Sequence, residues 1–238
     1  MDRSTQAGLD RPIWSALTTR HAQLAQGNEL ARRYHPDVAP FAAVASETSA
    51  AYQALHQFLQ SHEQVVSQTV DPIGPIEGFQ MTHRGMIHQM VATRHKSANT
   101  DDQGVIQLSN ADTKNMLALA ERVKLRAFGT RTCEMGNYIG IRDQGRLIAM
   151  AGERVRLDGY AEVSAVCVDE DWRGRGLGSR LVNVLRREIE RRGETPFLHV
   201  FSNNRLGIEL YEHLGFELRQ TFHLTRIYHA DPAPATDL

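Results

Sequence analysis

The sequence predicts an α+β protein, α/β in the broad sense, built on a mixed β-sheet that carries helices on both faces. In the second half of the chain, apolar runs of strand length alternate with segments of helical period, and Gly, Asn and Asp residues separate them. The clearest helix covers residues 177–192, where a leucine or isoleucine recurs every four residues from Leu177 to Ile189. The composition agrees, because 41% hydrophobic and 23% charged residues are typical of a globular protein.

The 238 residues divide at a polar, turn-rich run over residues 97–104. We therefore expect an N-terminal α/β region over residues 1–99 and a second unit over residues 100–238. A chain of this length can hold two small domains, or one domain with a large extension.

The N-terminal region shows two helical and four extended patterns. In the segment 50–60, helical spacing places Tyr52, Leu55 and Phe58 on one side. The proline- and glycine-containing run 71–75 separates the last two strands. In chain order we expect a helix over 12–26, strands over 32–34 and 41–45, a helix over 50–60, and strands over 64–70 and 78–93.

The second unit begins with a short strand over 105–108. Ser109 can cap the next helix together with Asp112, and the buried stripe of that helix should consist of Met116, Leu117, Ala120 and Val123. A hairpin joins the strands 137–141 and 146–156 through residues 143–145. The remaining expected elements are a strand over 161–168, the helix 177–192, a strand over 196–201, a helix over 205–214, and strands over 216–218 and 221–228.

Charge and cysteine content exclude several classes of protein. The formal net charge of −1 argues against general polyanion binding, because nucleic-acid-binding domains usually carry a basic excess. Two cysteines, Cys133 and Cys167, cannot build a disulfide framework, which favours a reduced, cytoplasmic protein. No signal peptide or membrane span is visible. The 11 histidines lack metal-ligand spacing, so we expect no metal and no nucleic-acid or membrane partner.

Residues 173–180 are the most informative stretch of the chain. Gly174, Gly176 and Gly178 remove side chains at alternate positions where a helix begins, and arginines surround them. The first turn of a helix leaves backbone N–H groups unpaired, with partial positive charge behind them. Such a start favours a phosphate-like anion. We therefore expect a ligand with more than one phosphate.

Two familiar phosphate-binding motifs fit this stretch poorly. A P-loop needs a Lys-Ser or Lys-Thr pair after its last glycine, whereas Ser179-Arg180 follows Gly178. The dinucleotide fingerprint needs its first glycine directly after the strand, whereas residues 169–173 intervene here.

Combined with two later features, the motif Arg173-x-x-Gly176-x-Gly178 resembles the GNAT superfamily of N-acetyltransferases. Asn204 lies just past the next strand, and Tyr211 follows it in Leu210-Tyr211-Glu212-His213-Leu214-Gly215-Phe216. The match covers residues 105–228 in element order and looks closest to the glycine-N-acyltransferase-like branch. The resemblance implies a mostly antiparallel sheet, with residues 1–99 as an extension, either a degenerate acyltransferase-like half or a lid.

The resemblance also implies acetyl-CoA as co-substrate. Backbone amides of the loop would hold its pyrophosphate, while Val166 and Val168 would pair with the pantetheine as an added strand does. The N–H of Cys167 or Val168 would stabilise the oxyanion, and Asn204 would bind the cofactor or cap a helix. The loop residues concerned are Arg173, Gly174, Arg175, Gly176, Leu177, Gly178 and Ser179.

In the family an amine attacks the thioester directly, without an acyl-enzyme. Tyr211 matches the position of the usual acid, which protonates the departing thiolate. Glu162, at the start of the strand and expected on the same face as Val166 and Val168, is the first candidate base. His199 and a bound water are the others. We expect Cys167 to be a core residue rather than a nucleophile.

The acyl acceptor is expected to be a small-molecule or peptide primary amine. By resemblance it would meet residues 128–138, with Thr130, Arg131, Thr132, Glu134 and Tyr138 as candidate contacts. Residues 1–99 would cover this cleft or form a homodimer surface. Two rivals remain, a non-catalytic acyl-CoA-binding or sensing module and a nucleotide-binding regulator, which ATP or NAD but not CoA would stabilise.

Overall fold

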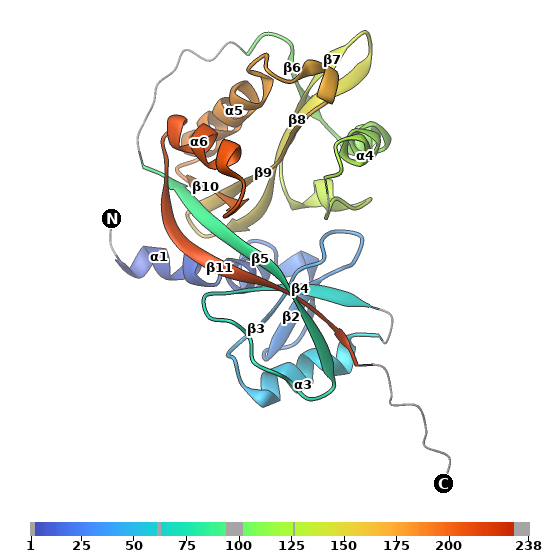
Figure 1. The fold of residues 1–238 in the computed structure, drawn as a ribbon, viewed down its shortest axis with the longest axis vertical. Helices are drawn as coiled ribbons and strands as arrows, with labels where there is room; N and C mark the ends of the chain where they lie inside the picture. Colours follow the sequence, from blue (N-terminus) through green and yellow to red (C-terminus); the bar gives the residue numbers. More distant parts are fainter. Residues whose placement is uncertain (1–2, 61–62, 94–101, 126, 231–238) are drawn as a thin grey trace.

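The computed structural model describes residues 3–60, 63–93, 102–125 and 127–230 (Figure 1). Helices are α1 (Arg3–Asp10), α2 (Pro12–Thr18), α3 (Ser49–Phe58), α4 (Thr113–Arg122), α5 (Leu177–Arg191) and α6 (Arg205–His213). Strands are β1 (Ala25–Gly27), β2 (Ala31–Tyr34), β3 (Ala42–Val44), β4 (Gln64–Thr69), β5 (Phe79–Ala92), β6 (Val105–Leu108), β7 (Tyr138–Asp143), β8 (Arg146–Leu157), β9 (Tyr160–Val168), β10 (Thr195–Phe201) and β11 (Phe216–His229).

Within the described residues, an 8-stranded sheet in the order β4-β11-β5-β10-β9-β8-β7-β6 forms the centre of the molecule. Its neighbours run antiparallel, apart from the parallel pair β9 and β10. Strands β1, β2 and β3 form a separate 3-stranded sheet. The mixed, mostly antiparallel sheet predicted from the sequence is therefore confirmed.

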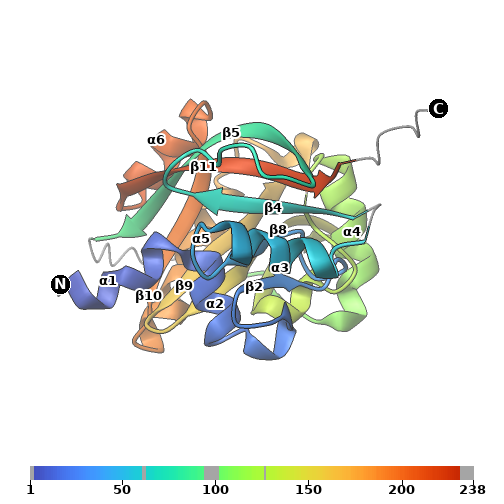
Figure 2. The same cartoon turned by 90° about the horizontal axis from the view of Figure 1, so that it is seen from below.

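Helices cover both faces of the large sheet, as predicted (Figures 1 and 2). On one face, α5 contributes Leu181, Leu185 and Ile189 to a core completed by β8, β9 and β10. On the other face, α1 and α2 pack against β8 and β10, and α4 packs against β7 and β8. The helix α3 covers β2 and β3 and the ends of β5 and β11.

Strands from both sides of the expected seam share the large sheet. Strand β5, from the first 99 residues, lies between β10 and β11 and pairs with both. The seam itself falls largely on residues 94–101, which lie outside the described residues. The large sheet is therefore built from both regions.

The helix expected over residues 12–26 is wrong in its second half. The helix α2 ends at Thr18, and β1 starts at Ala25. Between them, the buried His21 ring is held by a hydrogen bond of 2.9 Å between its Nδ1 and the Tyr34 hydroxyl. Pairing of β1 with β2 therefore overrides the helical pattern. The helix α1 was not expected from the sequence.

Two smaller expectations are also corrected. In α4, Leu119 is buried where Leu117 was expected, because residues 116, 119, 120 and 123 follow the helical period. The strands expected over 216–218 and 221–228 are one strand, β11. A register shift between Leu218 and Gln220 absorbs the interruption while pairing with β5 continues.

Candidate active site

The strands β9 and β10 separate shortly after they meet. Their parallel pairing runs from Tyr160 opposite Thr195 to Glu162 opposite Phe197. Beyond that point β9 pairs with β8, and β10 pairs with β5. In the described part of the chain, residues 163–168 of β9 therefore have no ladder on the side that faces β10, and their backbone groups there are left without strand partners.

A bulge in β9 lies within this unpaired stretch. Ala165 has a left-handed backbone (φ +51°), and the pairing with β8 steps by two residues from Met150 to Gly152 while β9 steps from Cys167 to Ser164. The extra residue reverses the alternation of side chains.

The reversal corrects the face expected for Glu162. Before the bulge, Val163 packs into the core beneath α5; after it, Val166 and Val168 pack there instead. Ala165 and Cys167 turn to the opposite face, toward α4. Glu162 consequently does not share a face with Val166 and Val168. The expectation was wrong because it assumed regular alternation along the strand, whereas a bulge intervenes.

The start of α5 adjoins the same end of β9. Gly174 (φ +75°) and Gly176 (φ +72°) have left-handed backbones, and Gly176 is the N-cap residue of α5. A Cβ atom placed on Gly178 would lie 3.8 Å from a methyl carbon of Val166 and 3.9 Å from one of Val168. The structure thus brings residues 173–179, the glycine loop, next to the part of β9 that does not pair with β10.

Residues 173–176 are exposed. The Arg173 amide donates to the Glu170 carbonyl (3.3 Å), whereas no backbone hydrogen bond is observed from the amides of residues 174–176 in the described chain. The Arg175 guanidinium lies 4.4 Å from the centre of the Trp172 ring, which orders one cation of the loop. Free helix-start amides and nearby arginines together favour an anion with several negative oxygens.

Asn204 and Tyr211 lie on α6. The side-chain oxygen of Asn204 accepts a hydrogen bond of 3.0 Å from the Gly207 amide, which makes Asn204 the N-cap of the helix. Tyr211 packs edge-to-face against Phe216, and its hydroxyl has no hydrogen-bond partner among the described residues. Burial raises the pKa of Tyr211, so the phenol keeps its proton at neutral pH.

Glu162 is fully buried and paired. Arg154 of β8 donates two hydrogen bonds to its carboxylate, of 2.5 and 3.0 Å, and His199 Nδ1 lies 2.8 Å from the same group. Burial opposes ionisation, but the Arg154 and His199 contacts outweigh it and lower the pKa of Glu162 to about 2. A carboxylate held in this way is a weak proton acceptor.

His199 links this pair to strand β4. Because a carboxylate can only accept, His199 donates from Nδ1 to Glu162. The side-chain nitrogen of Gln68 lies 2.6 Å from the Nε2 atom of His199. Sequence reasoning missed Arg154 and Gln68. Nothing in the sequence distinguished Arg154, because Glu153 and Arg156 are charged residues of the same strand.

The thiol of Cys167 is not equipped for nucleophilic attack. It is buried, and burial raises its pKa to about 12, so the reactive thiolate is scarce at neutral pH. This agrees with its expected role as a core residue.

Residues 128–138, the segment expected to meet the acyl acceptor, lie against residues 35–39. The Thr132 hydroxyl donates to the Val38 carbonyl (2.7 Å), and the Arg131 amide donates to the Asp37 carbonyl (2.9 Å). Arg131 and Glu134 pair with each other at 2.7 Å. Thr132 and Tyr138 are buried, and Thr130 is exposed. The first 99 residues thus form part of the surroundings of this segment.

Neither a metal-binding cluster nor a membrane-spanning helix occurs among the described residues. No group of three or more His, Cys, Asp and Glu side chains is arranged to hold a metal ion there. None of the helices observed in that part of the chain is long and apolar enough to cross a membrane.

The chain is similar to known proteins both in sequence and in fold. The family model for FR47-like proteins matches residues 138–225. A GNAT-family protein of known structure from Novosphingobium aromaticivorans is 34% identical, with a TM-score of 0.87, over 93% of this chain and 98% of that one. A GCN5-related N-acetyltransferase from Kribbella flavida has a TM-score of 0.65 at 18% identity over 97% and 98% of the two chains, a likeness of fold alone.

Among curated proteins, the ribosomal protein bS18-alanine N-acetyltransferase of Salmonella typhimurium is 39% identical over 90 residues. This match covers 36% of the present chain and 60% of the relative. The chain thus spans less than two thirds of the length of that relative.

Proposed function

Because this chain belongs to the GNAT family of N-acetyltransferases, we propose that it transfers an acetyl group from acetyl-CoA to a primary amine. The acceptor is a small molecule or the amine of a peptide. The amine attacks the thioester directly in a ternary complex, without an acyl-enzyme. The closer resemblance to the glycine-N-acyltransferase-like branch belongs to this proposal.

The observation that carries the proposal is the separation of β9 from β10 beside the glycine-capped start of α5. The unpaired edge of residues 163–168 offers amide and carbonyl groups to the two amides of pantetheine. The amides of residues 174–179 offer donors to the pyrophosphate, with Arg173 at the start of the loop. Val166 and Val168 hold the arm, the N–H of Cys167 or Val168 stabilises the oxyanion, and Asn204 adds a cofactor contact to its capping role.

The proton transfers are assigned to separate groups. Tyr211 protonates the departing thiolate, a role consistent with its free hydroxyl and its raised pKa. His199, or a water ordered near it, takes the proton of the amine, whereas Glu162 positions His199 and does not itself act as the base. The low pKa of Glu162 and its two hydrogen bonds from Arg154 support this division.

The test is release of CoA thiol from acetyl-CoA with a panel of amines. We expect Tyr211→Phe to lower kcat by about tenfold or more while acetyl-CoA binding is unchanged, since only the acid is removed. Tyr228→Phe is the matched control, because it removes a tyrosine hydroxyl at the far end of β11 from Phe216, the residue that Tyr211 contacts. The activity of this variant should equal that of the wild type. Tight acetyl-CoA binding without release for any amine would instead support the non-catalytic acyl-CoA-binding module.

A further inference from the structure

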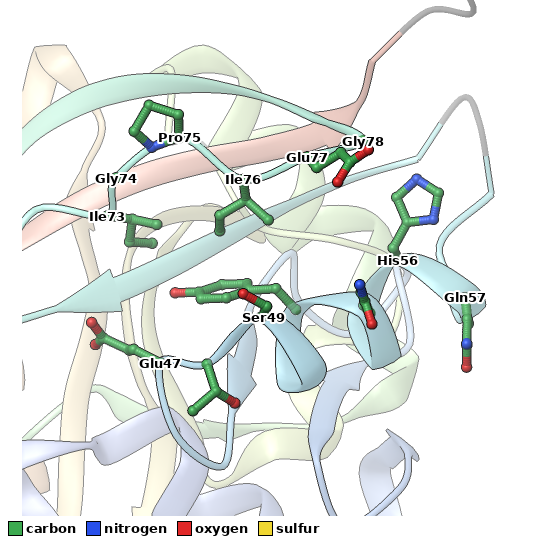
Figure 3. Close-up of a pocket in the computed structure, with 13 residues that line it drawn as sticks. Glu47, Ser49, His56, Gln57, Ile73, Gly74, Pro75, Ile76, Glu77 and Gly78 are labelled. Carbon is green, nitrogen blue, oxygen red and sulfur yellow. The ribbon is translucent and has the colours of Figure 1, made fainter.

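A hollow of about 630 Å³ lies between α3 and the loop formed by residues 73–78 (Figure 3). It is at the end of the molecule occupied by α3, whereas α5 and its glycine loop are at the other end (Figure 1). The proposed acetyl-CoA site therefore does not account for it. The lining residues are Glu47, Thr48, Ser49, Tyr52, Gln53, His56, Gln57, Ile73, Gly74, Pro75, Ile76, Glu77 and Gly78.

The charge of this hollow is negative. Its lining contains two carboxylates, Glu47 and Glu77, and neither Lys nor Arg. Within the described part of the chain, neither carboxylate has an ion-pair partner, and both residues are exposed. Figure 3 shows them apart, Glu47 just before α3 and Glu77 on the loop beside His56. A cation placed in the hollow would meet a carboxylate at either end.

The start of α3 does not reverse this preference. Thr48 caps the helix, with its hydroxyl accepting from the Ala51 amide, and Glu47 directly precedes it. A negative side chain at this position offsets the positive end of the helix dipole. An anion would therefore meet Glu47 before it reached the helix amides.

The part between the carboxylates is apolar and contains one unsatisfied hydroxyl. Ile73 and Ile76 line it from the loop, and Tyr52 lines it from α3. Tyr52 is only 5% exposed, and its hydroxyl has no hydrogen-bond partner among the described residues. Burial raises the pKa of Tyr52 to about 12, so the group remains a neutral phenol. A buried hydroxyl without a partner is costly and marks a place where a ligand atom can bond.

We propose that this hollow is a second binding site, separate from the acetyl-transfer site, for a linear diamine or polyamine. One ammonium group pairs with Glu47 and another with Glu77. The methylene chain between them lies against Ile73, Ile76 and the Tyr52 ring, which can also attract an ammonium group by a cation–π contact. The Tyr52 hydroxyl accepts a hydrogen bond from an amine once the ligand is bound.

The test uses ligands that cannot be acetylated, so that acceptor binding at the catalytic site does not interfere. Bis-quaternary ammonium compounds with increasing numbers of methylenes, together with a mono-quaternary compound of equal length, are titrated by calorimetry into the full chain. We expect the bis-cations to bind more tightly, with an optimum chain length, and added salt to weaken them. Spermidine and spermine, titrated without acetyl-CoA and compared between the wild type and Tyr52→Phe so that binding at the acceptor site is common to both, then test the hydrogen bond to Tyr52, which quaternary groups cannot make.

The variants Glu47→Gln and Glu77→Gln each remove one charge without changing the size of the side chain. Each should weaken bis-cation binding about threefold or more, as expected for partly exposed ion pairs, and the double variant should bind no better than the mono-cation. Tyr52→Phe should weaken spermidine but not the bis-quaternary compounds. Glu29→Gln, an exposed carboxylate outside the hollow, should bind as the wild type does.

The outcomes separate this site from the proposed enzyme activity. The proposal is overturned if the mono-cation binds as tightly as the bis-cations, if both single variants bind like the wild type, or if sulfate competes for the hollow. Acetyl transfer by Glu47→Gln should be unchanged when no polyamine is present. If the wild type shows no amine-dependent release of CoA, the proposed function is overturned, whereas the result for binding in the hollow still stands.

Discussion

Arg154 and Glu162 face each other from neighbouring strands, β8 and β9, and form an ion pair with two hydrogen bonds, of 2.5 and 3.0 Å. The Glu162 side chain is fully buried, and the Arg154 guanidinium also lies 4.9 Å from the centre of the Phe41 ring. This pair therefore connects the strand that carries the proposed cofactor edge to the N-terminal region. Glu162 also accepts the hydrogen bond from His199 Nδ1.

Removal of the Glu162 charge should destabilise the protein. In Glu162→Gln the buried Arg154 cation loses its counter-charge, and an NH2 donor replaces one of the two acceptor oxygens that Arg154 and His199 share. We expect a loss of about 3 kcal/mol in the free energy of unfolding. Urea denaturation measures it. Asp158→Asn is the control, since the Arg20–Asp158 pair is largely exposed (54% and 73%) and should contribute less than about 1 kcal/mol.

The same pair predicts a dependence of stability on acid. The pKa of Glu162 falls from 4.5 to about 2 on folding, so its contribution is complete above pH 4.5 and is lost as the pH falls toward 2. The free energy of unfolding is measured against pH for the wild type and for Glu162→Gln. Subtracting the second curve from the first cancels the contributions of the other carboxylates. The difference should shrink by roughly 3 kcal/mol across this range, and a difference independent of pH would contradict the pairing.

Glycines of the loop should differ in their tolerance of a methyl group. Gly176 has a left-handed backbone, and a Cβ atom there meets nothing within 4 Å, so Gly176→Ala should cost about 1 kcal/mol through backbone strain alone. It should also weaken acetyl-CoA binding, measured by calorimetry. In Gly178→Ala the new methyl makes ordinary contacts with Val166 and Val168, and stability should be retained. Equal losses in both variants would argue against the strain.

The bulge at Ala165 offers a further test of strain. A left-handed backbone costs an L-residue about 1–2 kcal/mol, and glycine avoids that cost at some loss of chain entropy. We expect Ala165→Gly to keep or slightly raise the stability, measured by thermal unfolding. Ala165→Val should lower it, because a β-branched side chain tolerates this conformation less well. A clear loss of stability in Ala165→Gly would show that the methyl group, rather than the backbone, matters there.

Local signals in the sequence were sufficient for most elements. The strand 105–108 and the start of the helix at Leu177 were located to the residue, since hydrophobic period and glycine positions act over short distances. The 14-residue strand β11 was divided in two, because a bulge that preserves pairing has the same local appearance as a turn. The short strand β1 was read as helix, because its only support is the pairing with β2.

The site was predictable where it depends on backbone conformation and less so where it depends on pairing. Gly174 and Gly176 could be recognised because left-handed positions favour glycine. The left-handed Ala165 has no such signature, and with the bulge unseen Glu162 was placed on the wrong face. The partner Arg154 lies on the neighbouring strand, so its contact with Glu162 follows from the sheet register.

The position of β5 was beyond local reasoning and leads to the last prediction. Both β10 and β11 pair with β5, which comes from the first 99 residues. Fragment 100–238 therefore lacks a strand that belongs inside its sheet, and we expect it to aggregate or to unfold without a cooperative transition. Adding fragment 1–99 should restore acetyl-CoA binding. As the control, a full chain cleaved between residues 99 and 100 after folding should stay together in size-exclusion chromatography. Cooperative unfolding of fragment 100–238 alone would instead establish it as an independent domain.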